Sequence, residues 1–189
     1  GEASSTTELG DTIKHGRRGS LSVELTVHGK QGHVAYPLEA DNAIHKSLAA
    51  LAELSQTTWD EGDADFPPTT FQLSNVHSGT GANNVIPGVL EASFNLRFSP
   101  AVTADELRAK IESIFSSHSV TPEIQWQLSG NSFLTPPGKL REVSAEAVKD
   151  VTGITPSFST AGGTSDGRFI APTGAEVVEI GPCNATIHK

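Results

Sequence analysis

The sequence predicts an α+β protein whose central part is a two-layer sandwich of four strands and two helices. Two observations support this prediction. Some segments alternate apolar and polar residues strictly, which is typical of strands with one buried face, and others repeat apolar residues at helical spacing. Between residues 20 and 133 these segments follow the order βαββαβ. The order matches a split βαβ sandwich of ferredoxin-like type.

The first strand is the most regular segment of the chain. Residues 21–27 place four apolar side chains on one face: Leu21, Val23, Leu25 and Val27. A tight, glycine-rich connection with His33 and Tyr36 follows. Asp41-Asn42 is typical of a helix start, which predicts a helix to about Ser55 with the apolar stripe Ile44, Leu48, Leu51 and Ala52.

The remaining central elements follow the same logic. A strand over 69–77 is predicted to point Phe71 and Leu73 inward, and the glycine-rich connection 78–84 leads to a strand over 90–98. Thr103 and Glu106 form a capping box that begins a helix, and the last strand contains Ile124, Trp126 and Leu128. With both helices on one face, we expect a polar opposite face and an edge available for pairing.

The segments that flank the central part do not continue its pattern of strands and helices. Residues 1–19 are typical of loop and linker, with a basic cluster at Lys14, His15, Arg17 and Arg18. After residue 138 a helix that ends at Gly153 and a mostly buried strand over 175–181 are expected, an alternation that suits an α/β sheet. Such a sheet needs more strands than this segment supplies. We therefore expect 1–19 and 134–189 to be remnants of a larger catalytic domain whose N-terminal part is absent, and 20–133 to be a separate domain.

The composition of the chain narrows the partners and the cellular location that can be expected for it. A net charge of −9 argues against nucleic acid or an anionic membrane as a partner. No apolar run is long enough to cross a bilayer, no secretion signal is visible, and the single Cys183 excludes an internal disulfide framework. A cytoplasmic location is the expectation.

Considered by spacing alone, the candidate functional residues carry weak signals. His33 lies in a loop between two rigid elements, where catalytic residues often occur, but a solvated histidine would look the same. Arg97 is a charged residue on the polar face of its strand, and the glycine pair in 162–166 leads into a possible anion-binding helix start. Glu2 and His188 have no local ligand partner.

Five motifs, spread over the chain in a fixed order, together resemble the M20 family of zinc amidohydrolases: residues 1–5, 32–37, 83–87, 162–168 and 184–188. The resemblance implies a lid and dimerisation domain flanked by remnants of an α/β zinc-peptidase-like catalytic domain. It also implies a homodimer through the lid domain. Residues 11–20 are most similar to a branch of the family that cleaves an amide of a small-molecule substrate with several carboxylates. A deacetylase, a dipeptidase and a purely structural dimerisation module are the alternatives.

The resemblance also implies roles for single residues. Glu2 and His188 match ligands of different ions in a two-zinc site, where cobalt may substitute, and the other ligands and the general base are expected to precede Gly1. The fragment alone is then expected to be inactive. His33 matches the catalytic histidine that reaches into the partner's active site. The matching substrate contacts are Arg17, Ser20, Tyr36, Asn83, Arg97, Gly163, Thr164 and Asn184. The sequence does not separate Arg17 from Arg18, and the remaining histidines, His15, His28, His45, His77 and His118, are expected on the surface.

Overall fold

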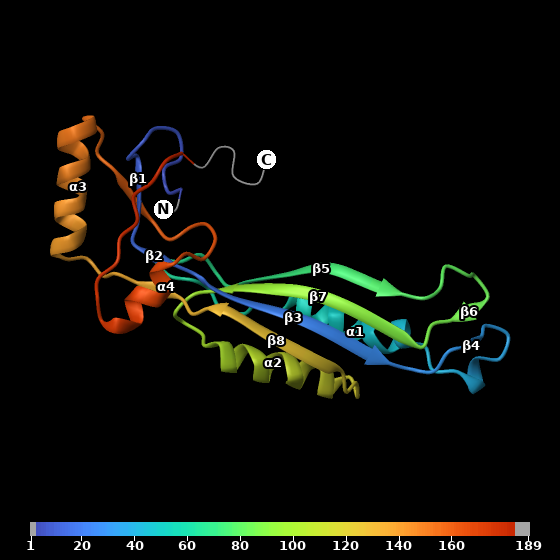
Figure 1. Ribbon diagram of the computed structural model, residues 1–189. Helices are drawn as coiled ribbons and strands as arrows, with labels where there is room; N and C mark the ends of the chain where they lie inside the picture. The colour runs from blue at the N-terminus through green and yellow to red at the C-terminus, as the bar shows by residue number, and fades with distance from the viewer. Residues whose placement is uncertain (1–2, 184–189) are drawn as a thin grey trace.

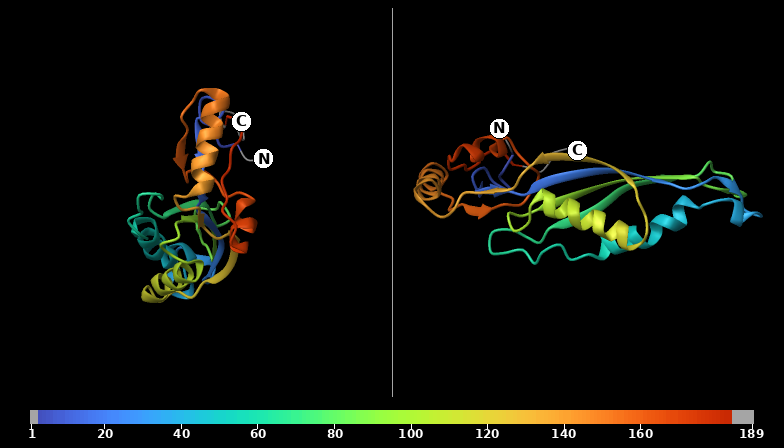
Figure 2. Two further views of the ribbon diagram at one scale, coloured as in Figure 1. Left: turned by 90° about the vertical axis from the view of Figure 1, so that its left-hand side faces the viewer. Right: turned by 90° about the horizontal axis from the view of Figure 1, so that it is seen from below.

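The computed structural model describes residues 3–183, and its centre is a four-stranded antiparallel sheet in the order β5-β7-β3-β8 (Figure 1). The strands are β3 (Gly19–His28), β5 (Thr70–Ser78), β7 (Val89–Phe98) and β8 (Glu123–Gly130). Two helices, α1 (Ala43–Gln56) and α2 (Ala104–Ser117), pack side by side against one face (Figure 2). This arrangement confirms the predicted α+β sandwich and its βαββαβ order.

Local sequence explains why these elements form. The four alternating apolar residues of β3 are all buried in the core beneath the helices. Thr103 begins α2 as expected, because its hydroxyl accepts from the Glu106 N–H at 3.2 Å and the Glu106 carboxylate accepts from the Thr103 N–H at 2.8 Å. Asn42 begins α1 by accepting from the N–H of Ile44 at 2.9 Å. The helix starts were therefore predictable from single residues.

The predicted inward face of α1 is wrong in part. Leu48 is 56% exposed and Ala52 is also exposed, whereas the buried side is made mostly of small residues: Ala43, Ser47, Ala50, Leu51 and Leu54. Small side chains let the helix approach the sheet closely, and the buried Ser47 hydroxyl is satisfied by the Ala43 carbonyl at 2.7 Å. Hydrophobicity alone did not identify this face.

Leu73 points inward as predicted, but its side chain is not buried. Leu73 lies opposite the buried Phe94, so it points toward the helix side as expected, yet it is 38% exposed. The reason is that β5 is an edge strand with an irregularity in register between Leu73 and Asn75, and no strand within residues 3–183 pairs with its outer side.

Two short strands extend one end of the sheet away from the rest of the chain. β4 (Gly32–His33) pairs with β6 (Val85–Ile86), and the 3-10 helix η1 (Pro37–Glu39) follows. We call these two connections, residues 29–42 and 79–88, the tip. The tip lies at the opposite end of the molecule from helix α3 (Lys139–Thr152) (Figure 1).

The expectation that residues 1–19 are loop and linker is wrong in part. β1 (Thr12–Lys14) pairs in parallel with β10 (Ser157–Ser159), and β2 (Gly16–Arg17) pairs with β9 (Phe133–Leu134). These strands have only two or three residues and their partners lie more than a hundred positions away. No local pattern could indicate them.

The strand expected over 175–181 does not form. The segment makes one isolated bridge, in which Glu179 and Lys14 exchange two backbone hydrogen bonds of 2.8 and 2.9 Å. Within this segment only Val177 is buried as predicted. Because no neighbouring strand in the described part of the chain offers the segment a row of backbone hydrogen bonds, it stays irregular. The helix α3 does end at Gly153, whose φ of 77° suits glycine. Short α4 (Gly167–Ile170) and η2 (Ala171–Thr173) precede the segment.

Candidate functional site

His33 is presented at the tip by a short ladder between two loops. The pairing of β4 with β6 places His33 opposite Val85, and the N–H of Val34 donates to the carbonyl of Asn84 at 3.1 Å. The loop with Asn83 therefore lies beside the loop with His33. Gly29 permits this path, because a Cβ at this position would overlap the carbonyl oxygen of Asp41.

The backbone selects one tautomer of the His33 ring. The N–H of Ala35 donates to Nδ1 at 3.0 Å, so the neutral ring carries its proton on Nε2. The ring is exposed, and Tyr36 lies beside it with ring centroids 5.9 Å apart. The tip thus offers an imidazole N–H donor to a group outside this chain's own core.

A second group of predicted residues lies near the other end of the sheet, on the face that the helices leave uncovered. Ser20 on β3 is directly opposite Arg97 on β7 and Gly130 on β8. The Ser20 hydroxyl accepts from the Asn95 side chain at 3.1 Å. A Cβ on Gly130 would overlap Cδ of Arg168, so the glycine leaves room for that arginine above the sheet.

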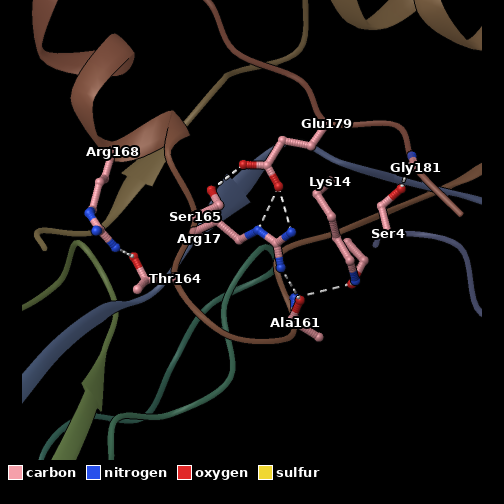
Figure 3. Close-up of polar contacts among 10 residues, drawn as sticks. Ser4, Lys14, Arg17, Ala161, Thr164, Ser165, Arg168, Glu179 and Gly181 are labelled. Atoms are coloured by element: carbon pink, nitrogen blue, oxygen red, sulfur yellow. Dashed lines mark hydrogen bonds and ion pairs between the residues drawn. The ribbon is translucent and has the colours of Figure 1, made fainter. Parts of the chain in front are cut away.

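Arg168 also organises the loop before α4. Its Nη1 donates to the hydroxyl of Thr164 at 3.3 Å, as Figure 3 shows. Arg18 precedes Ser20, and burial together with the nearby positive charge of Arg97 lowers the pKa of Arg18. Arg168 was not among the expected contacts, and the sequence left open whether Arg17 or Arg18 is one. Both occurred within segments that the sequence singled out, the basic cluster and the motif 162–168.

Arg17 is held differently from its neighbour. Its buried guanidinium donates to one carboxylate oxygen of Glu179 from Nε at 2.8 Å and Nη2 at 2.5 Å, and Nη1 donates to the Ala161 carbonyl at 3.3 Å (Figure 3). The second oxygen of Glu179 accepts from Ser165. Arg17 therefore ties the loop that contains Gly163 and Thr164 to β2.

The expectation of a surface position is wrong for His15. Its side chain is 3% exposed, and Nε2 lies 3.0 Å from the Asp65 carboxylate on the loop before β5. His28, His45 and His77 are exposed as expected, and His118 is half-buried. The burial of His15 could not be foreseen, because Asp65 is fifty residues away.

The expected site residues thus form two groups in one copy of the chain. His33, Tyr36 and Asn83 lie at the tip, whereas Arg17, Ser20, Arg97, Gly163 and Thr164 lie near β2 and α4 (Figure 1). Glu2, Asn184 and His188 lie outside the described residues. Within residues 3–183, no group of three His, Cys, Asp or Glu side chains could hold a metal ion. Over the same range, no helix is long and apolar enough to cross a membrane.

Comparison with known proteins gives one family and one group of relatives. Residues 15–122 match the peptidase dimerisation domain of the M20 family. Succinyl-diaminopimelate desuccinylases from Thioalkalivibrio sulfidiphilus, Alkalilimnicola ehrlichii and Acinetobacter baumannii are 59%, 60% and 58% identical over all 189 residues. These residues are 50% of each relative, so the chain spans about half the length of the curated relatives it matches.

Solved structures share the fold at lower identity. A tripeptidase from Staphylococcus aureus has a TM-score of 0.75 at 19% identity, covering 94% of this chain and 46% of the tripeptidase. An aminopeptidase from Bacillus cereus has a TM-score of 0.75 at 20% identity, with 94% and 47% covered. An M20 metallo-carboxypeptidase from Sulfolobus solfataricus has a TM-score of 0.72 at 15% identity, with 89% and 52% covered.

Proposed function

The chain belongs to the M20 peptidase family, and from this premise we propose that it is part of a succinyl-diaminopimelate desuccinylase. Such an enzyme hydrolyses N-succinyl-LL-2,6-diaminopimelate to succinate and LL-2,6-diaminopimelate, a precursor of lysine and peptidoglycan. The observation that carries the proposal is an identity of 58% to 60% with proteins of that name along the whole of this chain. Because those proteins are about twice as long, the activity is proposed for the complete enzyme and not for this chain alone. A cytoplasmic location belongs to the same proposal.

The residues at the tip are proposed to act on the developing oxyanion. Hydrolysis of an amide needs an activated water, a base for its proton and donors for the negative oxygen of the tetrahedral intermediate. The Nε2–H of His33 is a suitable donor, since Ala35 fixes the tautomer and the ring is exposed. Tyr36 and Asn83, which lie close by at the tip, are proposed to contact the substrate.

The residues at the other end of the sheet are proposed to hold carboxylates of the substrate. Guanidinium groups bind carboxylates by paired hydrogen bonds, and Arg97 pairs in register with Ser20, a buried residue on the sheet face opposite α1 and α2. Gly163 and Thr164 lie on the loop that Arg17 and Arg168 hold. Asn184, outside the described residues, completes the proposed set, and Arg17 is proposed to contribute either directly or by placing the loop.

Two zinc ions, replaceable by cobalt, are proposed for the complete enzyme, with Glu2 and His188 as ligands. Carboxylate and imidazole are suitable zinc ligands, and the ions would supply the acidity that activates water. Both residues lie outside the described part of the chain, and residues 3–183 contain no group of three or more His, Cys, Asp or Glu side chains that could hold a metal ion.

A homodimer through the edge strand β5 is proposed to bring the two groups together. The family match is to a dimerisation domain, and β5 is exposed along nearly its whole length. Leu73 and Val76 on β5 and Leu48 on α1 are exposed apolar side chains near this edge. Pairing of two β5 strands would satisfy their free backbone groups and bury these side chains. We propose residues 20–133 as the dimerisation domain, and 1–19 with 134–189 as parts of the catalytic domain.

The proposal can be tested with a chimera. In it, this chain replaces the matching half of the relative from Thioalkalivibrio sulfidiphilus, which is 59% identical. We expect the purified, metal-loaded chimera to release succinate from N-succinyl-LL-2,6-diaminopimelate far faster than it cleaves N-acetylornithine or a dipeptide. Preference for either of those substrates would contradict the proposal and favour another member of the family. The parent relative, prepared in the same way, is the control for correct metal loading.

A further inference from the structure

We propose that Asp65 is a positioning residue for the reaction. It lies in the connection between α1 and β5, residues 57–69, which we call the strap. From there it holds His15 and the start of the loop that contains Gly163 and Thr164, so the strap sets substrate affinity without touching the substrate. Gly163 and Thr164 are substrate contacts only under the proposed function, on which this proposal therefore rests.

The strap is held in shape by its own carboxylates. Asp60 accepts from the N–H of Thr69 at 3.0 Å and from the Thr69 hydroxyl, which joins the start of the strap to its end. Asp63 accepts from the N–H groups of Asp65 at 2.8 Å and Phe66 at 2.7 Å, and the Phe66 side chain is buried. Side-chain bonds of this kind fix the local backbone, so Asp65 is presented in a defined position.

Asp65 makes two contacts outside the strap, one through its side chain and one through its backbone. Its carboxylate lies 3.0 Å from Nε2 of His15, whose side chain is 3% exposed. Its carbonyl accepts from the hydroxyl of the buried Thr160 at 2.5 Å. His15 and Thr160 belong to the two segments that flank the proposed dimerisation domain. One residue of that domain therefore holds both flanking segments.

His15 depends on this contact, because its ring is otherwise surrounded by the protein without a polar partner. Its N–H donates to the Ser159 carbonyl at 3.3 Å and its carbonyl accepts from the Thr135 N–H at 2.7 Å, so its backbone is fixed. The ring lies edge-on to Phe158 with centroids 5.6 Å apart, and Nδ1 is buried with no partner within residues 3–183. Removing the Asp65 carboxylate would leave both ring nitrogens buried and unpaired, which is costly.

Residues 160–165, which we call the substrate loop, are fixed at three points. The strap contact is the first. The other two are the bond from Arg17 to the Ala161 carbonyl and the bond from the Ser165 hydroxyl to Glu179 (Figure 3). Of these three points, the strap contact is the one that joins the substrate loop to the dimerisation domain. The two proposed substrate contacts lie between these points, so loosening the strap should loosen them.

Backbone dynamics of the 189-residue chain test the positioning role without catalysis. T160V removes the hydroxyl that donates to Asp65 and keeps the size of the side chain. In T160V and D65A we expect the nitrogen-15 NMR order parameters of Gly163 and Thr164 to fall from about 0.85 to about 0.6 or less. D65N keeps an oxygen that can accept from His15, so it should retain the wild-type values.

The strap itself offers a matched control. Thr57 also donates its hydroxyl to a backbone carbonyl, that of Glu53 at 2.8 Å, but this bond lies within the end of α1. T57V should therefore leave the order parameters of the substrate loop unchanged. Wild-type order parameters in both T160V and D65A would overturn the positioning role.

The chimera tests the consequence for the reaction. D65A and T160V should each raise the KM for N-succinyl-LL-2,6-diaminopimelate about five- to tenfold, as expected for one lost buried hydrogen bond, and change kcat by less than roughly twofold. D65N and T57V should keep the wild-type KM. A lower kcat at unchanged KM would show a loss of folded enzyme only and would overturn the proposal. A chimera without desuccinylase activity would overturn the proposed function, while the order parameters would still decide whether the strap holds the substrate loop.

Discussion

Two adjacent arginines illustrate how a single residue's environment decides its role. Arg17 and Arg18 are neighbours with the same chemistry, yet the first is buried against Glu179 and the second has no carboxylate partner in the described part of the chain. Arg17 belongs to β2, whereas Arg18 lies between β2 and β3, so the two side chains have different neighbours. Arg17 contacts Ala161 and Glu179, and Arg18 lies near the positive charge of Arg97.

The ion pair between Arg17 and Glu179 predicts a large effect on stability. Replacing Glu179 with glutamine leaves the Arg17 charge buried without its counter-charge, so the free energy of unfolding should fall by roughly 3 kcal/mol. Urea denaturation followed by circular dichroism measures the change. The control is Asp105→Asn, which breaks the more exposed pair with Arg108 and should cost less than about 1 kcal/mol. Equal effects of the two substitutions would contradict the structural role of Glu179.

Among the elements, the two edge strands differ in the surface they offer. The β5 edge has exposed Leu73 and Val76 and lies near exposed Leu48. On β8, Trp126 is partly covered and lies beneath the Arg108 guanidinium, with 5.9 Å between that group and the ring centroid. An edge strand with apolar side chains is open to pairing with another strand. β8 has one exposed apolar side chain, Leu128, whereas the β5 edge has Leu73 and Val76 with Leu48 nearby, and this difference is why we propose the dimer at β5.

A charge on the β5 edge should therefore prevent dimer formation. Val76→Lys places an ammonium group where two β5 strands would meet, and we expect monomers in analytical ultracentrifugation at concentrations where the unchanged chain is a dimer. Gln125→Lys adds the same charge to an exposed position of β8 and serves as the control. A dimer that survives Val76→Lys but dissociates with Gln125→Lys would move the interface to the opposite edge.

At the scale of the whole molecule, the two groups of site residues cannot meet within one copy. The tip with His33 lies at one end of the sheet, and the paired residues Ser20 and Arg97 lie toward the other end, on the side of α4 (Figure 1). A shared active site therefore requires that the tip of one copy approaches the opposite end of another. Closed two-fold symmetry would produce two equivalent sites in such a pair.

Mixing two inactive variants of the chimera tests this arrangement. A chimera with His33→Ala should lose about 100-fold or more in kcat, as expected for an oxyanion donor. A chimera with Arg97→Gln should bind substrate weakly. Mixed dimers contain one site in which both residues are intact, so random exchange should restore roughly one quarter of the wild-type sites. No recovery after confirmed subunit exchange would show that His33 acts within its own copy or not at all.

Much of the central domain could be predicted from the sequence, for a physical reason that single elements make clear. β3 repeats every two residues over its whole length, and α2 begins at Thr103 with a cap whose partner is three residues away. Interactions of this kind are local, so their pattern is visible in the sequence. The inward face of α1 was less visible, because it depends on small residues that fit against the sheet.

By itself, the sequence determined the βαββαβ order, the helix starts and, through its motifs, the family of this chain. Only the tertiary structure decided that β1, β2, β9 and β10 form, that His15 is buried against Asp65, and that Arg97 and Arg168 lie on the two sides of Ser20. The physical reason is sequence separation. These contacts join residues many tens of positions apart, where burial and charge act through space and leave no periodic trace along the chain.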